Sequence, residues 1–107
     1  MVAAKSLLYR VVFTERAFSQ VRDADVWWRE NRRSAADAIG EELDRVVALL
    51  ASQPRVGARA KSERLPGVRR ILLSRVRYFV YYRVLEQEGA VEILAFWHGR
   101  RGSVPHV

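Results

Sequence analysis

The hydrophobic pattern of the first thirty residues predicts one strand followed by one helix. Residues 8–13 are rich in β-branched and aromatic side chains, which is typical of a β-strand. Thr14 can act as a helix N-cap, and Glu15 places a carboxylate in the first turn, where the helix dipole favours it. Apolar residues then recur at helical spacing, which predicts a helix over about residues 15–30. These residues are Ala17, Val21, Ala24 and Trp28.

A second apolar stripe predicts another helix, from Ser34 as its N-cap to about residue 53. The stripe consists of Ile39, Leu43, Val46, Val47 and Leu50. Pro54 would end this helix, and Gly40 would allow the first helix to approach closely. Because only residues 31–33 connect the two helices, we expect an antiparallel helical hairpin.

Three strands are predicted after the hairpin. Residues 54–67 contain two Pro and two Gly without periodicity, as in a loop. The strands are expected at residues 68–73, 76–85 and 90–98. Turns join them in sequence, so they would form an antiparallel meander with one face on the helices and the other face open. We therefore predict a single α+β domain over residues 1–107. Its order would be β-α-α-β-β-β, with the helical hairpin packed on one face of a small antiparallel sheet.

The long middle strand would carry two chemically different faces. Its even positions are apolar or aromatic and are expected in the core: Val76, Tyr78, Val80, Tyr82 and Val84. Its odd positions combine aromatic and basic side chains and are expected on an exposed surface: Arg77, Phe79, Tyr81, Arg83 and Leu85. Trp27 and Trp28 are also adjacent, and neighbouring helical residues point about 100° apart. Trp28 continues the apolar stripe, so Trp27 is the exposed candidate for a partner contact.

Positive charge is concentrated in one part of the chain. The formal net charge is +7, and residues 54–77 account for all of it, with eight Lys and Arg against Glu63 alone. Such a field attracts anionic surfaces, either nucleic acid or an acidic protein segment; a solvated, solubilising loop is the alternative interpretation.

Several kinds of chemistry are excluded or disfavoured. The chain has no cysteine, and His98 and His106 lack the spacing of metal ligands, so we expect no metal and no cofactor. No Ser-His-Asp arrangement, phosphate-binding glycine loop or pair of carboxylates stands out. His98 could serve as a general acid or base, but a structural role at the strand end is the alternative. We see no signal peptide and no membrane-spanning segment, and expect a cytoplasmic protein.

The combination of several segments resembles the RelE/ParE toxin superfamily of bacterial type II toxin–antitoxin pairs. These segments are Trp28, Arg70-Ile71-Leu72-Leu73, residues 78–84, and Ala95-Phe96-Trp97-His98-Gly99-Arg100-Arg101. The resemblance extends from about Tyr9 to Arg101. It implies a toxin that an antitoxin holds inactive by wrapping a C-terminal segment around it. RelE-like members resemble ribosome-dependent mRNA endonucleases, whereas ParE-like members act on DNA gyrase.

The nuclease residues of the RelE-like members are incomplete in this chain. Arg70 and Arg101 match basic positions of those members, but Leu72 and Phe79 stand where two further basic residues are expected. The C-terminal Tyr is missing. A phenyl ring cannot stabilise the charge of a phosphate undergoing cleavage. The resemblance therefore implies a ParE-like toxin that is not itself an enzyme.

Two alternative functions remain, and a set of residues is expected to contact the partners. A nuclease acting on mRNA at the ribosome would use Arg70, Tyr81, His98 and Arg101. A third possibility is a member that only forms an autoregulatory complex with its antitoxin. The candidate residues for binding the antitoxin and gyrase are Trp27, Arg69, Arg70, Arg77, Phe79, Tyr81, Arg83, His98, Arg100 and Arg101.

Overall fold

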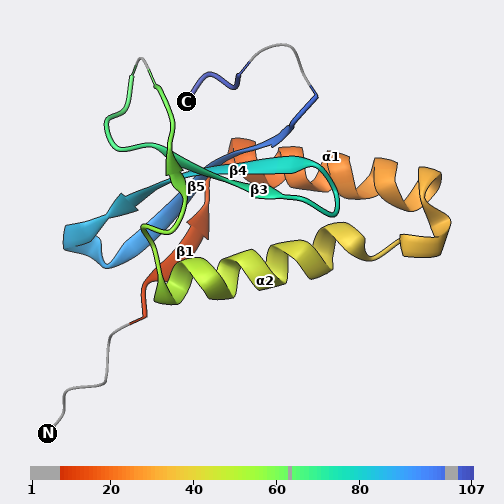
Figure 1. Cartoon of the computed structure of the whole chain (residues 1–107), viewed down its shortest axis with the longest axis horizontal. Coiled ribbons are helices and arrows are strands. Elements are labelled where there is room, and N and C mark those ends of the chain that lie inside the picture. Colours follow the sequence, from red (N-terminus) through yellow and green to blue (C-terminus); the bar gives the residue numbers. More distant parts are fainter. Residues whose placement is uncertain (1–7, 63, 101–103) are drawn as a thin grey trace, which may run out of the picture.

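The computed structural model describes residues 8–62, 64–100 and 104–107, which form two α-helices and a five-stranded sheet (Figure 1). The helices are α1 (Glu15–Asn31) and α2 (Ala38–Ser52). The strands are β1 (Arg10–Phe13), β2 (Ala58–Arg59), β3 (Arg69–Leu73), β4 (Tyr78–Leu85) and β5 (Ala90–His98). Two short 3₁₀ helices, η1 (Arg33–Ala35) and η2 (Glu86–Glu88), lie in the connections.

The strand order in the sheet is β1-β5-β4-β3-β2. The α+β class, the helical hairpin and its packing on one face of the sheet are confirmed. The sheet is mixed, however, because β1 runs parallel to its neighbour β5 while the other pairs are antiparallel. The parallel ladder continues at both ends, where Arg10 N donates to the Gly89 carbonyl (2.9 Å) and Thr14 N donates to the Ile93 carbonyl (3.0 Å). The short strand β2 lies within the segment predicted as a loop.

The N-cap of α1 is confirmed, and the predicted start of α2 is wrong. Thr14 Oγ1 accepts a hydrogen bond from Ala17 N at 3.0 Å. Ser34 lies in η1 instead, and α2 begins only after Asp37. The extra turn is fixed by the Trp28 indole, whose Nε1 donates to the Ala35 carbonyl at 2.9 Å. The predicted role of Gly40 is also wrong, since a Cβ placed there would meet no atom within 4 Å.

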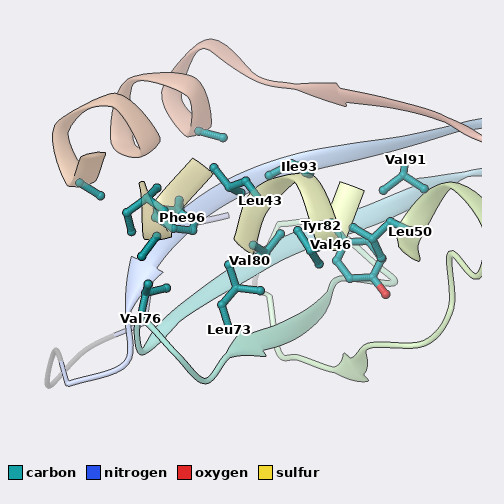
Figure 2. Packing of buried hydrophobic residues seen from close by; sticks show 14 residues of the cluster. Leu43, Val46, Leu50, Leu73, Val76, Val80, Tyr82, Val91, Ile93 and Phe96 are labelled. Atoms are coloured by element: carbon teal, nitrogen blue, oxygen red, sulfur yellow. The ribbon is translucent and has the colours of Figure 1, made fainter. Parts of the chain in front are cut away.

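The main core lies between the two helices and the even face of β4. In Figure 2, Leu43, Val46 and Leu50 lie close to Val80 and Tyr82. The buried members of this core are Ala17, Ala24, Ala38, Ile39, Leu43, Val46, Leu50, Leu73, Val76, Val80, Tyr82, Val91, Ile93 and Phe96. Tyr78 and Val84 pack against it, so the core role of the even positions is confirmed.

A register shift in β5 decides which of its side chains reach this core. Tyr81 pairs with Ala95, but Tyr82 pairs with Ile93, so Leu94 is the extra residue of a bulge. The bulge changes the alternation along β5. Ile93 and Phe96 consequently share the helix side of the sheet, and Leu94 and Ala95 both lie in a second cluster.

That second cluster covers the face that the sequence predicted to be open. Its buried residues are Val68, Tyr81, Leu94, Ala95 and Val107. The loop after β2 and the C-terminal residues lie on the opposite side of the sheet from α2 (Figure 1). Ser62 Oγ donates to the Val107 carbonyl and ties these two segments together. The prediction of an open face is wrong because it took only elements with regular patterns into account.

A buried tyrosine fixes the loop between α2 and β2. Gly57 N donates to the Tyr82 hydroxyl at 2.9 Å, and the Gly57 carbonyl accepts from the Arg69 guanidinium at 2.7 Å. A Cβ at position 57 would lie 2.7 Å from that hydroxyl and 2.8 Å from the Arg70 carbonyl. Only glycine therefore fits where the loop crosses the end of the ring.

Burial makes the stability of the fold depend on pH through Tyr82. Loss of solvation raises the pKa of Tyr82 and outweighs the Gly57 N–H and the Arg69 charge, which both lower it. A raised pKa means that folding disfavours the phenolate. The contribution of the neutral Tyr82 phenol to the free energy of unfolding is thus fully present below the ordinary tyrosine pKa of 10.0. It is lost as the pH rises above that value. Urea unfolding between pH 8 and 11 should show this fall, Tyr82→Phe should diminish it, and Tyr9→Phe should retain it.

Candidate functional site

Three predicted site residues meet on the face covered by the C-terminal segment. The Arg70 guanidinium lies over the Phe79 ring at 4.3 Å from its centroid and donates to the Tyr81 hydroxyl at 3.2 Å. The Tyr81 side chain is only 3% exposed. Its predicted exposure is therefore wrong, because the second cluster packs over its ring. Arg70, Phe79 and Tyr81 form a packed unit in which the cation is held against an aromatic ring.

An apolar row crosses the sheet beside this unit. Phe79 is the register partner of Leu72 on β3 and of Trp97 on β5, so the three side chains lie on the same face. Leu72 is 44% exposed. The two positions that the resemblance matched to basic residues of nucleases are therefore cross-strand neighbours and are both apolar.

Two further predicted partner-binding arginines already have intramolecular partners. Arg83 Nε donates to Glu92 Oε1 at 2.8 Å across the β4–β5 ladder. Arg69 donates to the Gly57 carbonyl, as described above. Both side chains stabilise the fold, and any partner that used them would have to compete with these contacts.

The remaining described candidates meet at one end of the sheet. Trp27, Arg77, His98 and Arg100 line a cavity of about 300 Å³, together with Trp28, Arg32, Val76 and Tyr78. The cavity lies where the C-terminal half of α1 meets the β3–β4 turn and the end of β5. Tyr78 and His98 are register partners, which places the start of β4 beside the end of β5. We call this cavity the sheet-end pocket.

Aromatic rings form much of the wall of the sheet-end pocket. The Tyr78 ring is stacked on Phe96, with centroids 4.5 Å apart, and lies nearly perpendicular to the His98 ring, with centroids 4.9 Å apart. The two indoles, Trp27 and Trp28, meet edge to face at 6.2 Å. The Arg32 guanidinium lies 5.2 Å from the Trp27 ring and 5.8 Å from the Trp28 ring. Trp27 remains 47% exposed, as the sequence predicted.

The backbone at the mouth of the pocket has an unusual conformation. Arg77 was expected in a strand, but β4 begins at Tyr78, and Arg77 lies in the preceding turn with a φ of 66°. It is the only non-glycine residue with positive φ in the described part of the chain. The Arg77 carbonyl accepts from Gly99 N at 2.7 Å. Next to it, Arg100 N donates to His98 Nδ1 at 3.0 Å, so that nitrogen acts as an acceptor.

Sequence reasoning missed Arg32 and Tyr78 as pocket residues. Arg32 was assigned to a connection, although its place four residues after Trp28 was a usable signal for a stacked cation. Tyr78 was assigned wholly to the core, but its half-buried ring also reaches the pocket. Arg101, predicted as the cation after the last strand, lies outside the described residues.

The arginines of the basic segment 54–77 pair with different parts of the described structure. Arg55 pairs with Glu86 of η2, whereas Arg75 pairs with Glu41 of α2 at 2.8 Å. These contacts lie on different elements. Within the described ranges, no group of three or more His, Asp or Glu residues is placed to hold a metal ion. None of the helices there is long and apolar enough to cross a membrane.

The sequence and the fold define the class of this protein. The model of the family described as the ParE toxin of type II toxin–antitoxin system, parDE, matches residues 11–102. The chain therefore belongs to the ParE toxin family. The comparison with curated proteins gave no significant match.

Solved structures with the same fold come from toxin–antitoxin systems. The chromosomal ParDE system of P. aeruginosa has a chain with a TM-score of 0.67 and 21% identity, over 86% of this chain and 97% of that one. The isolated E. coli RelE toxin has a TM-score of 0.61 and 21% identity, over 89% of this chain and 88% of that one. A chain of the intact E. coli RelBE complex has a TM-score of 0.63 and 22% identity, over 87% of this chain and 99% of that one. At these identities, the likeness concerns the fold.

Proposed function

We propose that this toxin inhibits growth by poisoning DNA gyrase and that a cognate antitoxin neutralises it by binding its surface. The observation that carries this proposal is the apolar row formed by Leu72, Phe79 and Trp97. A nuclease that activates the RNA 2′-hydroxyl needs cations and proton-transfer groups around the phosphate. Apolar side chains at these neighbouring positions favour a binding protein over a nuclease, in line with the family match to ParE.

The state of Arg70 and Tyr81 adds support. Arg70 is engaged by the Phe79 ring and the Tyr81 hydroxyl, and Tyr81 is buried. A catalytic contact by the buried Tyr81 hydroxyl would require the second cluster to open, and Arg70 would have to share its guanidinium group with this hydroxyl. Binding a macromolecule makes no such demand and can use the exposed rim of the fold.

An antitoxin partner is supported by the exposed apolar side chains of α1 and by charge. Phe18, Val26 and Trp27 are large apolar residues exposed on this helix. Exposed Phe and Trp side chains such as these are enriched at protein interfaces, so α1 offers anchor residues to a partner. The net charge of +7 would favour an acidic segment as the partner. The structural relatives from the ParDE and RelBE systems agree with a toxin that is paired with an antitoxin.

A supercoiling assay tests the target. Purified full-length chain added to gyrase, ATP and relaxed plasmid is expected to block supercoiling and to accumulate cleaved plasmid. Arg100→Gln should weaken the inhibition, while Arg10→Gln, which removes the same charge from the exposed first residue of β1, should not. Uninhibited supercoiling over a wide range of toxin concentrations would contradict gyrase as the target.

The nuclease alternative has its own readout. RelE is among the structural relatives, and Arg70 contacts Tyr81, another residue of the alternative nuclease site. The nuclease alternative is therefore tested by adding the chain to an extract that translates mRNA. We expect intact mRNA in the presence of the chain. Cuts that require translating ribosomes and disappear with Arg70→Gln would favour the nuclease and overturn the proposal.

A further inference from the structure

We propose that the sheet-end pocket binds a phosphorylated nucleoside, with the phosphate among Arg32, Arg77 and Arg100 and the base against Trp27. The pocket goes beyond the proposed function, because its ligand can be identified without gyrase and without an antitoxin. It also lies apart from the Arg70–Tyr81 cluster, since Tyr78 belongs to the helix side of β4 and Tyr81 to the other side.

The charge of the lining points to an anion. Among the described residues, the lining of the cavity includes three arginines and no Asp or Glu. Within the described residues, Arg32, Arg77 and Arg100 are absent from the ion pairs that neutralise other arginines. A guanidinium group offers only donors, so a ligand that satisfies all three must be rich in acceptors.

The number of cations favours phosphate over carboxylate. A phosphate monoester carries a charge of about −1.5 to −2 and three strong acceptor oxygens. A single carboxylate carries one charge and two oxygens. Three arginines around one cavity therefore match a terminal phosphate better than an Asp or Glu side chain or an internal phosphodiester, which has one charge.

The volume and the rings favour a base next to that phosphate. The cavity of about 300 Å³ lies at the lower end of the range of roughly 300–1,000 Å³ that is typical of small-ligand sites. A lone inorganic anion would leave much of it unfilled. Trp27 offers an indole that is 47% exposed, and bases of any kind stack on such rings.

The conformation of Arg77 supports a functional role for this residue. A φ of 66° favours glycine, because an ordinary residue meets steric strain there. The strained turn is held by Arg77 N, which donates to the Leu73 carbonyl at 2.8 Å, and by the bond from Gly99 N to the Arg77 carbonyl. Backbone strain of this kind concentrates at functional sites. Neither of these backbone bonds requires a guanidinium group.

This conformation also supplies a suitable variant. Arg77→Gly removes the guanidinium group and relieves the strain, so the variant is expected to fold, with an unchanged circular dichroism spectrum. Arg10→Gln is the matched control, because Arg10 is the exposed first residue of β1 and does not belong to the pocket lining.

Binding to the full chain tests the proposal by calorimetry and fluorescence anisotropy at one fixed salt concentration. The probes are AMP, adenosine, inorganic phosphate, a hexanucleotide with and without a 5′-phosphate, and a hexapeptide of glutamates. We expect the 5′-phosphate to strengthen hexanucleotide binding about tenfold or more. Arg77→Gly should weaken the binding of the phosphorylated hexanucleotide about tenfold or more, and Trp27→Ala about fivefold or more. Arg10→Gln should weaken it less than about twofold.

Each outcome decides for or against the pocket. Tight AMP binding would identify a free nucleotide as the ligand, and a preference for the phosphorylated hexanucleotide would identify a strand end; both support the proposal. If AMP does not bind and the two hexanucleotides bind equally, or if Arg77→Gly and Arg10→Gln lose equally, only diffuse charge attraction remains and the proposal is overturned. Equally tight binding of the glutamate peptide would assign the pocket to an acidic protein segment and overturn it. Gyrase is absent throughout, so failure here leaves the proposed function untouched.

Discussion

Replacing Tyr82 by alanine is expected to lower the free energy of unfolding by about 4 kcal/mol, in the range of aromatic-to-alanine changes in cores. The Tyr82 ring is fully buried between α2 and the sheet, and its hydroxyl holds the Gly57 amide at 2.9 Å. The change leaves a cavity and an unpaired buried N–H. Small domains unfold at a cost of only about 5–15 kcal/mol, so this one residue carries a large share. Guanidinium unfolding followed by circular dichroism measures the loss.

Tyr82→Phe separates the ring from the hydroxyl. It keeps the packing and removes only the acceptor of the Gly57 amide, which predicts a loss of about 1–2 kcal/mol. If the alanine and phenylalanine variants unfolded at the same denaturant concentration, the ring would contribute little, and the assignment of Tyr82 to the centre of the core would be wrong.

The regular elements of this fold could be predicted because their information is local. Thr14 caps α1 by accepting a hydrogen bond from the N–H of Ala17, only three residues away. The strand predicted at residues 90–98 coincides with β5. The apolar stripes of both helices, apart from Val47, and the even positions of the predicted strand 76–85 reach the core. In each case the spacing of side chains along a few residues determines which face is buried.

Pairings between distant segments could not be predicted in the same way. Nothing in residues 10–13 specifies that their partner is β5 or that the pairing is parallel. The burial of Tyr81 depends on Val107, which reaches the sheet through an irregular segment. Irregular segments have no period that would reveal which face they cover, so a covered face was predicted to be open.

The candidate site shows the same division. Trp27, His98 and Arg100 were singled out from two distant parts of the sequence, and the fold places them in one pocket. Arg77 reaches that pocket only because the β3–β4 turn is longer than predicted and places it outside the strand. The turn lacks the usual glycine or asparagine, which concealed the positive φ. An arginine at a position whose positive φ favours glycine therefore becomes visible only when the backbone conformation is known.

The adjacent tryptophans are expected to respond very differently to substitution. Trp28→Ala should lower the free energy of unfolding by about 3 kcal/mol, at the lower end of the range for large aromatic residues because this side chain is half-buried. The change removes packing against the core and the hydrogen bond to the Ala35 carbonyl that fixes the turn into α2. Chemical unfolding of the full chain measures this loss, and hydrogen exchange should report faster opening at the start of α2.

Trp27→Ala provides the matched control one residue away. Its indole is 47% exposed and touches mainly Trp28 and Arg32, so the expected loss of stability is about 0.5 kcal/mol. Because it leaves the fold intact, any loss of gyrase inhibition or nucleotide binding in this variant reports on the surface itself. Equal destabilisation by the two variants would show that both indoles belong to the core, and Trp27 would then have no free ring to offer a ligand.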